Sequence, residues 1–124
     1  MARINKGSIL ESRYTYGWEC QSYDFYEVVE VSAKGMATLR PLDKDRRYFP
    51  GPDGKIYYDT PEEVSPSSET RTWHNWRTGR VEPMPNIRRK IYNFGEDGRE
   101  YLKPEEYHRA VLWTGKPKDV WNYH

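Results

Sequence analysis

The clearest pattern in the chain is a run of β-branched and aromatic residues over positions 23–32. Most alternate positions from Tyr23 to Val31 are apolar, which places an apolar face on one side of an extended strand. Tyr26 and Val28 add apolar groups on the opposite face. A strand that is buried on both faces is typical of a small barrel or sandwich, and we expect such a strand here.

A second strand is predicted over residues 36–40, joined to the first by a short turn at Ala33-Lys34-Gly35. Gly35 supplies the positive φ that tight turns require. Pro41 follows directly, and a proline favours a sheet edge or a bulge. Upstream, residues 9–16 fit a further strand, which residues 17–22 would connect to this hairpin.

The residue composition changes between Pro50 and Ser68. Residues 49–54 consist of turn-forming types, and residues 61–68 are rich in Pro, Ser and Glu. Too little chain lies on either side for two separate cores. We therefore expect one β-rich domain over residues 1–124, with an ordered excursion and a flexible arm at about 50–68.

In the second half of the chain, residues 70–76 and 87–94 again have a pattern typical of strands. A tight turn is predicted after the second of these, at 95–98. Pro104 is placed well to begin a short helix that runs to His108. Residues 110–113 fit either the last turn of that helix or a closing strand. The predicted fold class is mainly β: a small SH3-like or related barrel, or a bent antiparallel sheet, with one short helix.

Composition explains how such a polar chain can fold. Charged residues make up 31% of the 124 residues and the mean hydropathy is −1.09, yet 15% of the residues are aromatic. Disordered segments are poor in aromatic residues, so this combination predicts a core dominated by Tyr and Trp beneath a polar surface.

The net charge, the cysteine content and the absence of targeting signals indicate which cellular compartment and which partners to expect. Lys and Arg total 20 and Asp and Glu total 19, which gives no overall field toward nucleic acid or membranes. Cys20 is the single cysteine, so no intramolecular disulfide can form. The first residues lack the apolar segment of a signal peptide, and no apolar run approaches the roughly 18 residues of a membrane span. We expect a cytoplasmic protein.

No catalytic or cofactor signature is present, and we predict a protein that is not an enzyme, with no cofactor and no metal. Two alternatives were weighed against this prediction. Cys20 with the scattered histidines would be metal ligands only if the fold brought them together: His74, His108 and His124. Glu27 falls on an otherwise apolar face, where a carboxyl group would suit general acid catalysis. A position at a barrel rim, or a partner such as an arginine, is the simpler explanation for Glu27.

Binding chemistry is better represented than catalysis. Three basic clusters stand out in the sequence: Arg40 with Lys44, Arg46 and Arg47; Arg71 with Arg77 and Arg80; and Arg88-Arg89-Lys90. The second cluster is interleaved with Trp73 and Trp76. Trp, Tyr and Arg dominate protein interfaces, whereas rings mixed with guanidinium groups also suit single-stranded DNA or RNA. The predicted binding residues are Trp73, Trp76, Arg77, Arg71, Arg88, Arg89, Tyr57 and Tyr58.

The chain also resembles small uncharacterised proteins encoded by bacteriophages and plasmids. The resemblance covers both ends: residues 16–19 and 24–29 match a Gly-aromatic-acidic opening followed by Asp-Phe-Tyr-x-Val-Val, and residues 34–42 match a turn and a strand that ends in Arg-Pro. Residues 112–117 and 121–124 match a Trp-x-Gly-Lys-Pro motif and a final Tyr-His.

The middle of the chain departs from this pattern. Glu19-Cys20-Gln21-Ser22 stands where the family has Asp-Gln-Thr-Asn, and residues 50–68 look like an insertion. The resemblance implies a mobile genetic element acting inside a bacterial cell and no particular activity. It implies a binding protein that engages a host or defence-system protein, with nucleic acid as the alternative partner. Neither the oligomeric state nor the role of residues 19–22 follows from the sequence.

Overall fold

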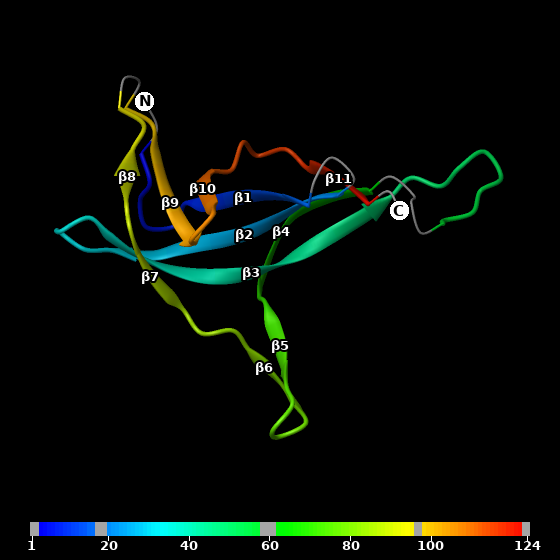
Figure 1. The fold of residues 1–124 in the computed structure, drawn as a ribbon, viewed down its shortest axis with the longest axis horizontal. Helices are drawn as coiled ribbons and strands as arrows, with labels where there is room; N and C mark the ends of the chain where they lie inside the picture. The colour runs from blue at the N-terminus through cyan, green and yellow to red at the C-terminus, as the bar shows by residue number, and fades with distance from the viewer. Residues whose placement is uncertain (1–2, 17–19, 58–61, 96–97, 123–124) are drawn as a thin grey trace.

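The computed structural model describes residues 3–16, 20–57, 62–95 and 98–122, and these residues form β-strands with no helix (Figure 1). In chain order the strands are β1 (Ile9–Tyr16), β2 (Cys20–Val31), β3 (Met36–Tyr48), β4 (Glu62–Thr70), β5 (Thr72–Asn75), β6 (Arg80–Pro83), β7 (Ile87–Lys90), β8 (Tyr92–Asn93), β9 (Glu100–Glu105), β10 (His108–Leu112) and β11 (Lys118–Asn122). The mainly β prediction is confirmed.

Nine of these strands form one strongly bent antiparallel sheet in the order β7-β3-β4-β11-β2-β1-β10-β9-β8. An additional pairing of β3 with β2 closes a small barrel from β2, β3, β4 and β11. Strands β1, β10, β9 and β8 extend from β2 as a wing, and β7 borders the first part of β3. The predicted strand at residues 9–16 and the hairpin around Gly35, whose φ is 80°, are confirmed.

Strand β2 is buried on both faces, as its sequence predicts. Phe25 points into the barrel with Leu42, Val64 and Val120, while Val28 on the other face belongs to a second cluster. A register shift between Val28 and Glu30 reverses the alternation of β2 against β3. Val31 therefore packs against the second cluster and not on the side of Phe25, which corrects the face assigned from simple alternation.

The second cluster lies beneath the wing. It joins β1, β2, β3, β9 and β10, and its buried members are Ile4, Leu10, Tyr26, Val28, Ala37, Leu39, Leu102 and Ala110. The two clusters lie on opposite faces of β2 and β3, so these two strands form the wall between them. Two modest cores that share one wall give this short chain enough buried apolar area to fold.

Pro41 lies inside β3, in the gap between two neighbouring strands. Strand β7 pairs with β3 as far as Leu39, and β4 pairs with it from Leu42 onward. The Pro41 carbonyl faces this gap, where it accepts from Arg71 N at 2.9 Å. Because the nitrogen and the carbonyl of one strand residue face the same edge, the missing N–H of the proline removes no ladder bond. The predicted edge-like role of Pro41 is found, although its side chain is fully buried.

The predicted helix from Pro104 to His108 is wrong. Strand β9 keeps an alternating pattern in which Leu102 and Pro104 are buried and Lys103 is exposed, and β10 follows after two turn residues. The buried Pro104 thus continues the two-residue period of a strand. In the sequence this period is hard to see, because Pro104 follows Lys103 and precedes Glu105 and Glu106. Residues 110–112 belong to a strand and not to a helical turn.

The Pro/Ser/Glu-rich part of the 50–68 excursion contributes a barrel strand. Strand β4 begins at Glu62, and Val64 within it is buried in the barrel. The predicted strand at 70–76 is divided at Arg71 into the end of β4 and β5. The predicted strand at 87–94 is divided at Ile91, whose N–H donates to Gly35 O at 2.9 Å. Residues 96 and 97 of the predicted turn lie outside the described residues.

Strands β5 and β6 form a separate two-stranded sheet that projects away from the barrel (Figure 1). In the part of the chain that the structure covers, no helix is long and apolar enough to cross a membrane.

The two-core arrangement predicts additive energetics for residues that share no neighbour. Leu102→Ala creates a cavity beneath the wing and Val64→Ala creates one in the barrel, so we expect losses of roughly 2–5 and 1–3 kcal/mol. Urea unfolding of both single variants and the double variant measures this, and the double loss should equal the sum within about 0.5 kcal/mol. A coupling well above that value would show that the two clusters behave as one core.

Candidate binding hairpin

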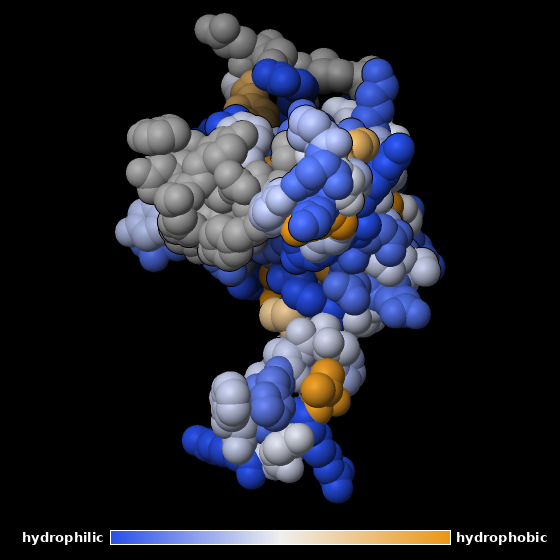
Figure 2. All heavy atoms as spheres, turned by 90° about the vertical axis from the view of Figure 1, so that its right-hand side faces the viewer, coloured by the Kyte–Doolittle hydropathy of each residue, from blue (hydrophilic) through white to orange (hydrophobic). Residues whose placement is uncertain are grey.

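The β5–β6 hairpin exposes aromatic, aliphatic and basic side chains to solvent. Trp73 is 43% exposed and Trp76 at the tip is 85% exposed, while Val81 on β6 is 69% exposed. Trp73 lies opposite Glu82, and His74 lies opposite Val81 on the other face of the ribbon. In Figure 2 the hairpin stands off from the body of the molecule, with an apolar group among hydrophilic ones.

The tip of the hairpin is held by local hydrogen bonds. The Asn75 side chain accepts from Arg77 N at 3.0 Å and donates to Glu82 Oε2 at 3.3 Å. Gly79 N donates to Asn75 O at 2.8 Å, and the glycine φ of 70° permits the chain reversal. A tilted contact with ring centroids 4.3 Å apart joins Trp76 to His74. The exposed rings are thus presented on an ordered turn.

Arg71 fixes the base of this hairpin to the barrel through its backbone. Its N–H donates to Pro41 O, and its carbonyl accepts from Met84 N at 2.8 Å, just beyond the end of β6. Both strands of the hairpin are therefore held by hydrogen bonds at one residue, at the point where β4 ends and β5 begins.

The Arg71 side chain adds a second attachment. Its guanidinium group donates to Leu42 O at 3.2 Å and Phe25 O at 3.4 Å, and it lies 3.8 Å from the Asp24 carboxylate. It also covers the Tyr26 ring, with 5.3 Å from Cζ to the ring centroid. Burial raises the pKa of the Tyr26 phenol, and the adjacent Arg71 charge opposes that shift.

The structure brings together only part of the predicted binding set. Trp73, Trp76 and Arg77 meet on the hairpin and line a shallow hollow with Asn75. Arg71 lies at the base, with its guanidinium group held against the backbone of β2 and β3 and over the Tyr26 ring. Sequence reasoning missed Val81 and Asn75, because their roles follow from pairing across the ribbon and not from residue type.

The other predicted binding residues lie elsewhere. Arg88 and Arg89 are on β7, and the Arg89 side chain donates to Pro104 O at 3.2 Å. Tyr57 is exposed in the loop after β3, where its hydroxyl donates to the Asp53 carboxylate. This hydrogen bond raises the pKa of Tyr57. Tyr58 lies outside the described residues.

The basic cluster that begins at Arg40 is largely paired within the sheet. Arg40 pairs with Glu27 at 3.0 Å, so of the two simpler explanations for that carboxylate the arginine partner is found. Lys44 lies 3.2 Å from Asp24, and Arg46 lies 2.9 Å from Glu62. These ion pairs hold neighbouring strands together, so they leave little of this cluster for a ligand.

The residues weighed for metal binding and catalysis are dispersed. His74 is on the projecting hairpin, whereas His108 begins β10 and pairs with Glu105 at 3.1 Å. Cys20 begins β2, and His124 lies outside the described residues. Within the described ranges, no group of three or more His, Cys, Asp or Glu side chains is placed to hold a metal ion.

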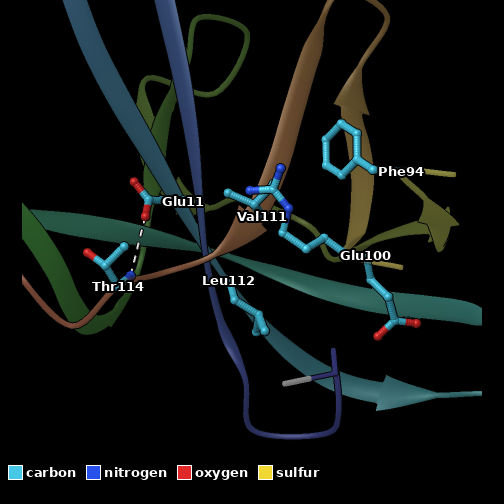
Figure 3. Close-up of a pocket in the computed structure, with 7 residues that line it drawn as sticks. Glu11, Phe94, Glu100, Val111, Leu112 and Thr114 are labelled. Carbon is cyan, nitrogen blue, oxygen red and sulfur yellow. Dashed lines mark hydrogen bonds between the residues drawn. The ribbon is translucent and has the colours of Figure 1, made fainter. Parts of the chain in front are cut away.

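A second feature that sequence reasoning missed is a pocket between β1, β10 and the loop before β9 (Figure 3). Glu11 is buried at its wall, where it accepts from Thr114 N at 3.3 Å and pairs with Lys118 at 3.0 Å. Figure 3 shows Phe94 and Val111 facing the pocket, with the Glu100 carboxylate directed away. Glu11 thereby joins β1 to the segment that leads into β11, a contact that no local pattern could predict.

Comparison with known proteins adds no assignment. No protein-family model matches the chain, and neither the curated proteins nor the solved structures contain a match. The candidate site therefore rests on geometry.

Replacing Arg71 by Met keeps an apolar stem and the backbone hydrogen bonds of residue 71. It removes the guanidinium donors, which form the second attachment of the hairpin base. We expect a loss of roughly 2–4 kcal/mol, since hydrogen bonds from a charged group contribute about 1.5–3 kcal/mol each and this side chain is partly exposed. Urea unfolding measures the loss, and hydrogen exchange of the β5–β6 amides should accelerate. Arg77→Met at the tip is the matched control and should change stability by less than about 0.5 kcal/mol. Equal effects of the two variants would contradict the anchoring role.

Proposed function

We propose that the protein is a non-enzymatic binding module that docks its β5–β6 hairpin into a partner protein. The observation that supports this most directly is the exposure of Trp76 at the tip of an ordered, projecting hairpin. Water-exposed Trp on a convex element contributes nothing to the core of its own chain. Catalytic and small-molecule sites are usually concave, whereas a convex ribbon fits the groove of another macromolecule.

The order of the hairpin favours affinity. Association costs about 0.5–1.5 kcal/mol for each rotamer-rich side chain that must be immobilised. The hydrogen bonds of Asn75 and the contact between His74 and Trp76 meet part of that cost before binding. Trp and Arg are also the residues that contribute most to interface hot spots.

A protein fits this surface better than a nucleic acid does. Arg71 is engaged with the barrel, which leaves Arg77 and Arg80 on the outer part of the ribbon with the acidic Glu82. The exposed Val81 offers an apolar group that suits a protein pocket and gains little from a phosphate backbone.

The resemblance to phage and plasmid proteins supports the choice of partner class. We propose a host or defence-system protein inside the bacterial cell, with inhibition by occlusion as the mode of action. The SH3-like topology stays a prediction.

A pull-down from nuclease-treated bacterial lysate tests the proposal. The tagged wild-type protein and Tyr107→Ala should retain the same protein, and Trp73→Ala/Trp76→Ala should lose it. Tyr107 is the matched control, since it is 86% exposed at the turn between β9 and β10. Each hot-spot ring contributes 2 kcal/mol or more, so affinity for the purified partner should fall at least about 100-fold in the double variant.

Circular dichroism and urea unfolding of the double variant should match the wild type, because surface substitutions of this kind change stability by about 0.5 kcal/mol or less. Unfolding would mean that the rings belong to a core. Retention of the same partner by the double variant, or loss of every partner on nuclease treatment, would overturn the proposal.

A further inference from the structure

Three aromatic rings gather on the outer end of the wing, remote from the hairpin. Tyr92 of β8 stacks on Tyr101 of β9 with centroids 5.4 Å apart, and Phe94 lies 4.4 Å from Tyr101. Tyr92 is 37% exposed, and the other two rings are half-buried. Strand β8 is the last strand of the sheet, so one side of this ring cluster is open to solvent.

Four cationic groups surround these rings. Lys90 and Lys103 each place their ammonium group 5.4 Å from the centroid of Tyr92. Arg99 lies 5.5 Å from the centroid of Phe94, and Arg109 lies 5.4 Å from Phe94 and 5.0 Å from Tyr101. All four cationic residues are exposed. They come from β7, β9, β10 and the segment before β9, so only the fold brings them together.

Carboxylates near the cluster make contacts outside it. Glu100 accepts from Ile4 N at 2.7 Å, and its carboxylate points away from Phe94 in Figure 3. Glu105 pairs with His108, and Glu11 pairs with Lys118. Glu96 and Asp97 lie outside the described residues. The platform formed by Lys90, Tyr92, Phe94, Tyr101, Lys103 and Arg109 therefore places three exposed cationic groups around its rings.

We propose that this platform binds single-stranded nucleic acid. Bases stack on aromatic faces regardless of their identity, and phosphates pair with Lys and Arg placed beside those faces. Tyr92 is the most exposed of the three rings and lies beside the Lys90 and Lys103 ammonium groups, so a base and its phosphate would find both kinds of contact in one place. Duplex DNA has its bases stacked internally and cannot use the rings, so the platform discriminates between single strands and duplexes. This site shares no residue with the proposed hairpin interface.

Fluorescence anisotropy with a labelled oligothymidylate of about 16 nucleotides tests the platform. The wild-type protein should bind it at about 50 mM salt and lose affinity as salt rises to about 200 mM. Lys90→Gln/Lys103→Gln should weaken binding about tenfold and lower the slope of log K against log salt by about 1.4, because each single-strand phosphate contact contributes about 0.7. Tyr92→Ala should weaken binding about tenfold with little change of slope.

Matched controls separate this site from general charge and from the hairpin. Lys55→Gln/Lys116→Gln removes the same charge from exposed loop positions and should change affinity less than about twofold. Trp73→Ala/Trp76→Ala should bind oligothymidylate like the wild type.

Three results would overturn the proposal: no binding by the folded wild type at low salt, an equal loss in the control pair, or equal affinity for duplex DNA. Displacement of oligothymidylate by poly-glutamate at equal charge concentration would assign the platform to an acidic protein segment instead. If the hairpin variant alone lost oligothymidylate, the nucleic-acid site would lie on the hairpin.

Discussion

The fold depends on a constraint of strand pairing: a strand has two hydrogen-bonding edges, yet β2 and β3 each have three partners. Each strand meets the constraint by dividing one edge. Residues 20–21 of β2 pair with β11 and residues 25–31 pair with β3, while residues 36–39 of β3 pair with β7 and residues from 42 onward pair with β4. The division closes the barrel and creates the branches that carry the exposed surfaces.

A divided edge leaves a gap in the hydrogen-bond ladder, and Arg71 fills the gap on β3. Its N–H donates to the Pro41 carbonyl on the edge where neither β7 nor β4 pairs with that residue, and its guanidinium group donates to two further carbonyls nearby. Buried main-chain carbonyls without a donor would cost about 1–3 kcal/mol each. Because the same residue ends β4 and begins β5, satisfying the barrel also sets the direction in which the hairpin leaves it.

The sequence predicted what local alternation encodes and missed what pairing decides. Strand β1 and the hairpin around Gly35 followed from period-two patterns and turn chemistry. The helix at Pro104 was wrong because local propensity outweighed a short alternation, and Val31 changed face because of a bulge. Trp73, Trp76 and Arg77 meet because they are neighbours in sequence. The ring platform was missed because Tyr92, Tyr101 and Arg109 meet only across three strands.

The two proposed surfaces lie on different sides of the molecule: the β5–β6 hairpin projects on one side of β3, and β8 and β9 lie on the other (Figure 1). Each surface uses side chains that lie outside the two cores: those of the hairpin beyond Arg71, and those of β8 and the outer face of β9, whose inner face contributes Leu102 to the core. The buried residues of β2, β3 and the strands packed on them provide the stability, and the surfaces proposed for recognition lie outside these cores. Because the hairpin and the platform share no residue, we expect that binding at one leaves the residues of the other available, so that a partner protein and a nucleic-acid strand could be held at the same time.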